Sequence, residues 1–587
     1  MGRSFHRLGF GLIACLALSA CSPSSPEDKA GDRAGSPLSY SFTLSQQEFD
    51  ALSPDEQFMV ANKALSTMYR GLPADEFFDL TQGLDQPVVQ YDNFINRTQV
   101  ALQTKLKPSE ELALEKDIFG IEDQPDTEEV DESIPSRFRD LRNNRTDQIF
   151  LAKAHTYPIS HDQFVHWMSY FLANTIMFSP ALEMDSTDNQ DVQRVLVYLQ
   201  ESLASGKDIR TVIRGWLNNL SRWRVSRSPE NHALEMFELY LGVFNDSPEE
   251  QQNTINGGIA CNDLFLTDDA EDYQLARDTT QVGVKVPLKV FDQYIYDCEG
   301  LYGVVAGHPL LIPRVVEVIS NYFLDSMSSE KKRSVVNDVL STGPETFEDV
   351  FLAVMFSKVF LLESERPKTF EENAFNFLHA MHWTPRSSEF GTLGKRVFNN
   401  LLNSTSSQIA VEKMGWSAMD YKIGRTPFLP MDVLSFASYH QAIRESVLLN
   451  NRAFDGRNYP KTEDFTEALE PREPPFEIVD GGFYIAGTEN LKPELDALTL
   501  DEFIDFVFLT AMGRKATAVE REDLKAIGET RDHLRYYEND DGVEVLSLRR
   551  GNGGDDELYE YWTDDFAEIM LDYMSRLPEF YYYRAVQ

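Results

Sequence analysis

A run of acidic and polar residues at helical spacing carries the strongest chemical signal in this chain. Residues 226–242 read S-R-S-P-E-N-H-A-L-E-M-F-E-L-Y-L-G, with a proline near the start and a glycine at the end. These boundary residues predict a helix. Asn231, Glu235 and Glu238 are spaced i, i+4 and i+7, so they share one face of it, while the leucines and Phe237 share another. This is the densest polar constellation in an otherwise apolar helical region.

The polar face of this predicted helix has two interpretations. Converging carboxylates bind divalent cations or act as general acid and base, so Glu230, Glu235 and Glu238 are the catalytic candidates. His232 is a candidate base or ligand, and Asn231 is a candidate binding residue.

The alternative, which we favour, is structural. Glu230 then stabilises the helix N-terminus, and Glu235 and Glu238 form ion pairs that hold one helix to the next. The arginines at suitable positions upstream are Arg210, Arg214 and Arg222.

The remaining histidines do not predict a metal site. His379 and His382 are spaced i and i+3, which suits two ligands of one metal, but no third ligand is identifiable. His155, His161 and His166 do not match the H-E-x-x-H pattern. The chain also lacks a P-loop, G-x-S-x-G, G-x-G-x-x-G and C-x-x-C-H. We therefore expect no resident metal and no cofactor.

The N-terminus predicts export and a lipid anchor. Arg3 and Arg7 precede an apolar segment, Leu8 to Ala20, that is too short to span a bilayer. The following Leu18-Ser19-Ala20-Cys21 resembles the lipobox of bacterial lipoproteins. That resemblance implies cleavage before Cys21, lipidation of its thiol, and membrane attachment through the acyl chains. Ser22 in place of an aspartate favours the outer membrane. An ordinary cleavable secretory signal is the alternative.

Two cysteines remain for the folded body once the signal is removed and Cys21 is lipidated. In an oxidising compartment we expect a Cys261–Cys298 disulfide, with two buried thiols as the alternative. The formal net charge is −41. Such a surface repels phosphate backbones, so nucleic acid is not an expected partner. The acidity serves solubility or, alternatively, a cation or a basic partner.

The patterning along the chain predicts a mainly α-helical fold. We expect a multi-helix globular body with one disulfide-stapled irregular insertion and one or two small β-hairpins, at Asp480-Gly481-Gly482 and at Val543–Leu548. The apolar run 348–362 predicts one buried central helix. The predicted regions are a signal peptide (1–20), a flexible tether (21–40), an N-terminal helical region (41–146), a central helical domain (147–460) with its insertion (247–308), and a C-terminal helical region (461–587).

Several stretches resemble a large family of mostly helical bacterial exported proteins of unknown function. P-E-N-H-A-L-E-M-F-E-L-Y-L-G is similar to the family helix N-E-N-Y-A-R-E-L-x-E-L-x-x-x-G. G-R-T-P-F-L-P-M-D-V and the ending S-R-L-P-E-F-Y-Y-Y resemble later family motifs. Leu234 stands at the arginine of the helix motif, and His232 stands at its tyrosine. The resemblance implies a helical fold and an exported location. It also implies a neighbour, because such proteins are often encoded beside an exported protein of sulfatase-like or alkaline-phosphatase-like fold.

Together these observations predict a lipid-anchored envelope protein. The favoured function is a scaffold or binding subunit for an exported partner protein or an extracellular polymer. The alternative is a hydrolase of envelope or exogenous polymers that uses the carboxylates of residues 226–242.

Overall fold

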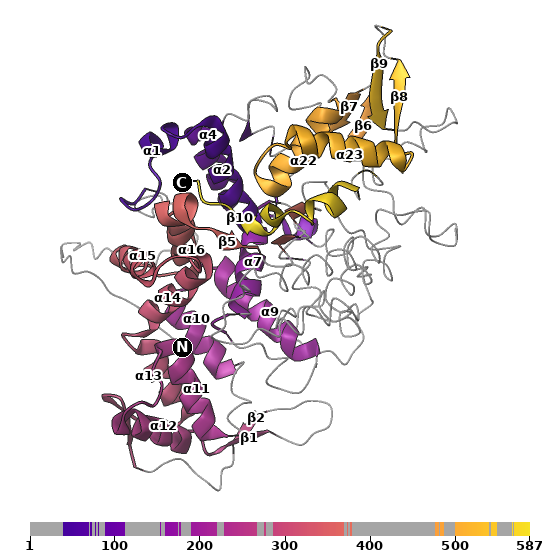
Figure 1. Cartoon of the computed structure of the whole chain (residues 1–587). Coiled ribbons are helices and arrows are strands. Elements are labelled where there is room, and N and C mark those ends of the chain that lie inside the picture. Colours follow the sequence, from indigo (N-terminus) through magenta and orange to yellow (C-terminus); the bar gives the residue numbers. More distant parts are fainter. Residues whose placement is uncertain are drawn as a thin grey trace, which may run out of the picture.

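The computed structural model confirms a mainly α-helical chain (Figure 1). It describes residues 39–72, 89–111, 159–177, 189–219, 228–266, 286–368, 499–538 and 569–586, apart from residues 70 and 174. It also describes residues 153, 275–277, 542–548 and 566, and parts of 77–81, 372–377 and 476–485. Outside these residues lie the predicted signal peptide, residues 21–38 of the predicted tether, Arg222, His155, His379 and His382; this part of the tether includes Cys21.

The helices follow one another with short connections in most of the described ranges. Their bounds are α1 Gln46–Asp50, α2 Pro54–Tyr69, α4 Tyr91–Gln103, α7 His161–Ala173, α9 Asn189–Ala204, α10 Ile209–Asn219, α11 Pro229–Leu241, α12 Pro248–Ala260, α13 Cys298–Gly307, α14 Leu311–Phe323, α15 Ser329–Ser341, α16 Phe347–Met355, the π-helix η6 Val359–Glu363, α22 Leu500–Met512, α23 Ala518–Thr530 and the 3₁₀-helix η10 Pro578–Tyr581.

Local capping explains many of these boundaries. At the start of α22, the Thr499 hydroxyl accepts from the Glu502 amide while the Glu502 carboxylate accepts from the Thr499 amide. The same reciprocal box opens α16 and α23. It satisfies amides that have no partner within the helix. Ser53 and Glu56 form the same reciprocal box before α2.

A cluster of aromatic rings joins the helices at the centre of the body. Phe171 of α7, Phe323 of α14 and Phe351 of α16 pack against one another, with ring centroids 4.9 Å apart for Phe171–Phe351 and 6.1 Å for Phe171–Phe323. Trp167 packs edge to face against the same cluster, 5.3 Å from Phe351.

In Figure 1, α10, α11, α13, α14 and α16 form one column, and α12 crosses its lower end. The C-terminal helix α22 lies beside the N-terminal α2, with α23 next to α22.

The run 348–362 is not the single helix that its apolar pattern predicts. α16 ends at Met355, and the π-helix η6 begins only at Val359. Between them the main chain bonds to an N-terminal segment: the Leu44 amide donates to the Phe356 carbonyl, and the Lys358 amide donates to the Phe42 carbonyl. This pairing, centred on a Thr43–Ser357 bridge, competes with the helical bonds and so breaks the helix.

The other side of the same segment receives the C-terminus. Strand β10 (Tyr582–Tyr583) pairs antiparallel with β5 (Arg366–Pro367), and the Val586 amide donates to the Leu362 carbonyl. Residues 356–368, which we call the hub segment, therefore contact both ends of the described chain. The three predicted helical regions all contribute contacts here.

The region 247–308 is more helical than the predicted irregular insertion, since α12 and α13 occupy its two ends. The predicted disulfide is confirmed: Cys261 is the residue that ends α12, Cys298 is the first residue of α13, and their Cα atoms are 4.5 Å apart. Closing a loop of 37 residues contributes about 4 kcal/mol in the chain-entropy account. Two antiparallel strand pairs, β1 (Leu264–Leu266) with β2 (Leu275–Arg277) and β3 (Leu288–Val290) with β4 (Gln293–Ile295), lie between the helices.

Two further strand pairs lie in the C-terminal region. The predicted hairpin around Asp480 and Gly481 is confirmed by β6 (Phe476–Val479) pairing with β7 (Gly482–Ile485). The predicted strand at 543–548 is β9 (Glu544–Leu548), and its partner among the described residues is the preceding β8 (Leu534–Glu538).

Within the described part of the chain, no individual helix has both the length and the apolar composition to cross a membrane. α13 and α14 reach that length only together, and they are bent by 66° where they meet.

Gly258 allows α12 to cross the first turn of α11 at close range. A Cβ atom at Gly258 would lie 2.7 Å from the Cα of Glu230 and 2.9 Å from its amide nitrogen, both main-chain atoms. Gly258→Ala should therefore force the helices apart and lower the free energy of unfolding by about 1–3 kcal/mol. Denaturant titration followed by circular dichroism measures this change.

Gly303 provides the matched control, because it lies in α13 and a Cβ there would meet nothing within 4 Å. Gly303→Ala should stabilise the protein by about 0.5–1 kcal/mol through helix propensity. Equal effects of the two substitutions would contradict the close crossing.

Candidate functional site

The helix predicted within residues 226–242 is α11, and it begins and ends at the expected residues. Ser228 is the N-cap, and its hydroxyl accepts from the Asn231 amide. Pro229 occupies the first turn, where its missing N–H costs nothing. Gly242 ends the helix at φ 67°, a left-handed conformation that favours glycine, and its amide donates to the Glu238 carbonyl.

Burial divides the five candidate residues of α11 into two groups. His232 lies in the core with 2% of its surface exposed. Glu230 and Asn231 are exposed near the N-terminus, and Glu235 and Glu238 are half-buried on the outer side. The structure therefore does not bring His232 together with the carboxylates on one accessible face.

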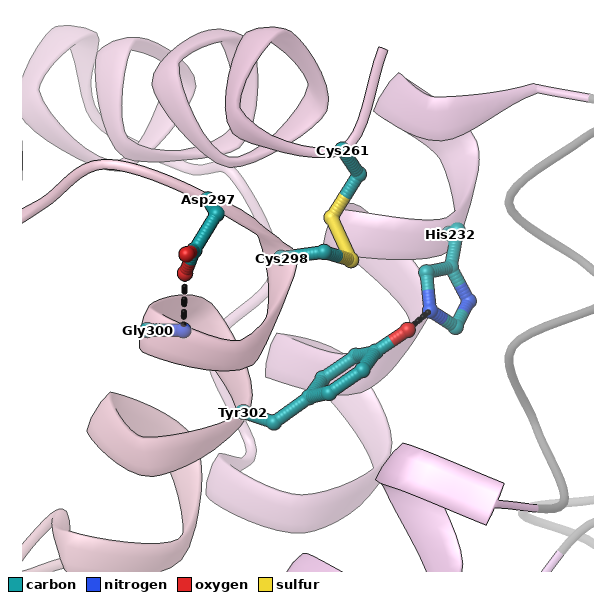
Figure 2. Close-up of a disulfide and its surroundings, with 6 residues drawn as sticks. All are labelled: His232, Cys261, Asp297, Cys298, Gly300 and Tyr302. Carbon is teal, nitrogen blue, oxygen red and sulfur yellow. Dashed lines mark hydrogen bonds between the residues drawn. A yellow bond between two sulfur atoms is a disulfide. The ribbon is translucent and has the colours of Figure 1, made fainter. Parts of the chain in front are cut away.

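His232 is hydrogen-bonded within the core beside the disulfide. Its Nε2 lies 3.1 Å from the hydroxyl oxygen of Tyr302 in α13, and the two rings meet edge to face (Figure 2). Figure 2 also shows the Cys261–Cys298 bond next to this pair. A histidine in this position links α11 to α13, and it is poorly placed to accept a proton from an external substrate.

The outer face of α11 holds a loosely coupled set of polar groups. The side-chain amide of Asn231 donates through Nδ2 to Glu235 Oε1 at 3.4 Å, the long limit of a hydrogen bond. Burial, together with the neighbouring Glu235 carboxylate, raises the pKa of Glu238. A carboxyl group with a raised pKa beside a second carboxyl group is an arrangement used for acid–base chemistry, so this pair carries the catalytic alternative.

Two arginines near α11, Arg210 and Arg314, bond to main-chain carbonyls. Arg210 is one of those expected to pair with the α11 carboxylates. Arg210 donates to the carbonyls of Ala306 and His308 at the end of α13, at 2.7 and 2.9 Å. Arg314 of α14 donates to the Leu239 carbonyl of α11 at 3.2 Å. Positive groups at helix C-termini are stabilising. Among the described residues, neither Arg210 nor Arg214 forms the predicted ion pair with Glu235 or Glu238, and the pairing predicted for Arg222 lies outside them.

The other histidines that the structure describes are also partnered. His161 Nε2 lies 3.0 Å from Glu348 Oε2, which connects α7 to α16. His166 is buried, with its Nε2 3.9 Å from Glu111 Oε1. Within the described ranges, no group of three histidine, cysteine or acidic side chains is arranged to hold a metal ion.

A second polar cluster, which the sequence did not reveal, surrounds the hub segment. Arg366 is fully buried and bonds to the Glu372 carboxylate at 2.7 Å. Its guanidinium lies over the rings of Tyr322 and Tyr583, 5.3 and 4.8 Å from their centroids. Burial opposes the charge, yet Glu372 and these rings raise the pKa of Arg366 above its usual value. Arg366 is therefore held as a cation in the core.

Two buried lysines in this cluster bond to the ends of helices. Lys63 of α2 donates to the carbonyls of Phe360 and Ser364, each at 2.6 Å, around the end of η6. Lys368 donates to the Ala511 carbonyl at 2.8 Å, in the last turn of α22. Burial, with a contribution from Arg366, lowers the pKa of both lysines, and that of Lys368 falls to about 7.

One sequence signal could have found this cluster. Lys63 lies within V-A-N-K-A-L, where each neighbour is apolar or small, and residues 60–69 are all buried. A lysine inside such a run is rarely buried without a specific acceptor. Lys368 and Glu372 lack a comparable signal, because they follow Pro367 in a polar stretch.

The core role of His232 predicts a stability effect that the exposed acids do not share. Tyr302→Phe removes the hydrogen bond to His232 without changing the ring, so the free energy of unfolding should fall by about 1 kcal/mol. Glu230→Gln, on the exposed first turn of the same helix, should change it by less than about 0.5 kcal/mol. Denaturant titration measures both changes. A loss of stability in Tyr302→Phe no larger than that in Glu230→Gln would contradict the buried position of His232.

The lowered pKa of Lys368 predicts a pH-dependent stability. Between pH 7 and about pH 10 the unfolded chain keeps this proton while the folded chain loses it, so stability rises with pH across that window. The slope from one group is at most about 1.4 kcal/mol per pH unit. Lys368→Met should flatten the wild-type curve by up to this slope above pH 7 and leave its shape unchanged below pH 6. A difference that grows only below pH 6 would contradict the assignment.

No family model, no curated protein and no solved structure matches this chain. The similarity of α11 to the N-E-N-Y-A-R-E-L helix accordingly stays a prediction from the sequence. The function has to be inferred from the residues and their geometry.

Proposed function

We propose that the chain is a lipid-anchored envelope protein that acts as a scaffold or binding subunit for an exported partner protein or an extracellular polymer. The observation that carries this proposal is the division of α11. Its histidine is hydrogen-bonded in the core, and its carboxylates lie apart from that histidine on the outer side. The helix with the best chemical signal thus has the features of a structural element with an acidic outer face.

The anchor and location rest on the N-terminal sequence. Leu18-Ser19-Ala20-Cys21 supports lipidation of Cys21, and Ser22 supports the outer membrane. The net charge of −41 supports a partner that is not itself strongly acidic. A large acidic body on a lipid anchor is suited to holding another molecule near the membrane.

The hydrolase alternative is supported by one specific observation, the raised pKa of Glu238 beside Glu235. In that function Glu238 would donate a proton to the leaving group, and Glu235 would be the second carboxyl group of the pair. His232 takes no part, because Tyr302 and the core surround it.

Capture of the full-length protein from detergent-solubilised membranes distinguishes the two functions. Wild type and the double variant Glu235→Gln with Glu238→Gln should retain the same stoichiometric partner or polymer, with Glu249→Gln on the exposed start of α12 as the matched control. Turnover of an envelope polymer by wild type, lost in the double variant while its melting temperature is unchanged, would replace the scaffold with the hydrolase.

A further inference from the structure

A small polar cavity lies where α2, the end of α22, the hub segment and the C-terminal strand meet. Its volume is about 20 Å³, and its lining includes Lys63, Lys368, Asn62, Asn376, Thr510 and Tyr583. A space of this size holds one water-sized occupant.

The charges around this cavity are unbalanced. Among the described residues, Arg366 and the two lysines Lys63 and Lys368 lie beside one buried carboxylate, Glu372, which bonds directly to Arg366. The exposed Glu365 carboxylate also acts on Lys63. Among the described residues, both lysines bond to neutral oxygens: Lys63 to main-chain carbonyls and the Ser364 hydroxyl, and Lys368 to the Ala511 carbonyl. With both lysines protonated, three positive charges lie beside the two carboxylates of Glu372 and Glu365, so one further anion balances the described groups.

Hydrogen-bond donors are available to such an anion. An ammonium group has three N–H donors, and the Ala511 carbonyl is the hydrogen-bond acceptor that Lys368 contacts within the described part of the chain. Aromatic rings flank the same ammonium, with Tyr583 at 5.1 Å and Phe580 at 5.8 Å from their centroids. These rings stabilise a cation but accept no conventional hydrogen bond.

Asn376 supplies a second donor. Its Nδ2 lies 3.0 Å from the Tyr583 hydroxyl, while its Oδ1 is buried with no hydrogen-bond partner. The two ends of an amide are similar in shape, and their assignment follows the bonds that they make. With the amide turned over, its oxygen accepts from the Tyr583 hydroxyl and its N–H₂ takes the unpaired position. In that orientation the Asn376 N–H₂ group has no partner among the described residues and is free to donate to an anion.

The carbonyls at the end of α22 do not oppose an anion here, since they already have donors. The Leu509 carbonyl accepts from Asn62 Nδ2 at 3.3 Å and from the Gly513 amide at 2.9 Å. The Ala511 carbonyl accepts from Lys368. Lys63, bonded to the end of η6, adds positive charge on the other side of the cavity.

We propose that this cavity binds one monatomic anion, a halide such as chloride, held by the Lys368 ammonium and the Asn376 amide. The halide completes the charge balance of the core at the point where both ends of the chain meet. Binding favours the protonated form of Lys368, so halide affinity and protonation of this lysine reinforce one another. The site is independent of the scaffold function, because no residue of α11 takes part.

The purified full-length protein in detergent tests the site with the ions alone. At pH 6 and equal ionic strength, replacing sodium gluconate with excess sodium chloride or bromide should raise the melting temperature by about 2 °C. The rise should shrink at pH 9, where Lys368 is neutral. Lys368→Met should abolish the rise, and Lys289→Met, at a half-exposed lysine of the β3–β4 hairpin, should keep it.

Crystals of the wild-type protein soaked in bromide provide a readout that does not depend on any variant. An anomalous peak within about 3.5 Å of Lys368 Nζ supports the proposal. Equal melting temperatures in chloride and gluconate, or an ordinary water without anomalous signal at this position, would overturn it. A bromide peak that persists in Lys368→Met would also exclude the assigned ligand.

Discussion

The structure depends on buried cations that bond to the ends of helices. Lys63 bonds to the end of η6, Lys368 and Asn62 bond to the end of α22, and Arg366 is paired with Glu372 between them. Helix C-termini carry partial negative charge, so a cation placed there offsets part of its own desolvation. These contacts join α2, the hub segment and α22, which are separated by hundreds of residues along the chain.

Positive side chains also bond to helix ends around α11. Arg210 and Arg314 bond to carbonyls at the ends of α13 and α11, just as the lysines do at η6 and α22. His232 and Tyr302 fix α11 to α13, and the disulfide holds α12 against the start of α13. Of these positive side chains, Arg210, Arg314, Lys63 and Lys368 bond to carbonyls at helix ends, while Arg366 pairs with Glu372.

Features with local causes could be predicted from the sequence, and features with distant causes could not. Pro229 and Gly242 bounded α11, and the Thr499 cap gave α22 its start, because caps depend on residues three or four positions apart. The break between α16 and η6 depends on pairing with Thr43, and Lys63 depends on carbonyls 301 and 521 residues away. The apolar pattern therefore predicts neither feature.

The candidate site was only half predictable for the same reason. Helical spacing correctly placed the α11 carboxylates on the outer side of the helix. Whether His232 joined them depended on Tyr302, which lies 70 residues further along the chain. Arg210 was visible upstream, but its acceptors are main-chain carbonyls, which every residue supplies and which no sequence pattern marks.

Native-state hydrogen exchange followed by mass spectrometry tests the central role of the hub most directly. If buried cations join both ends of the chain into one cooperative unit, amides of α2, the hub segment, the last turn of α22 and residues 582–586 should exchange with the same opening free energy as α14. Exchange of residues 582–586 or of α2 at the rate of a frayed terminus, with α14 still protected, would contradict this account.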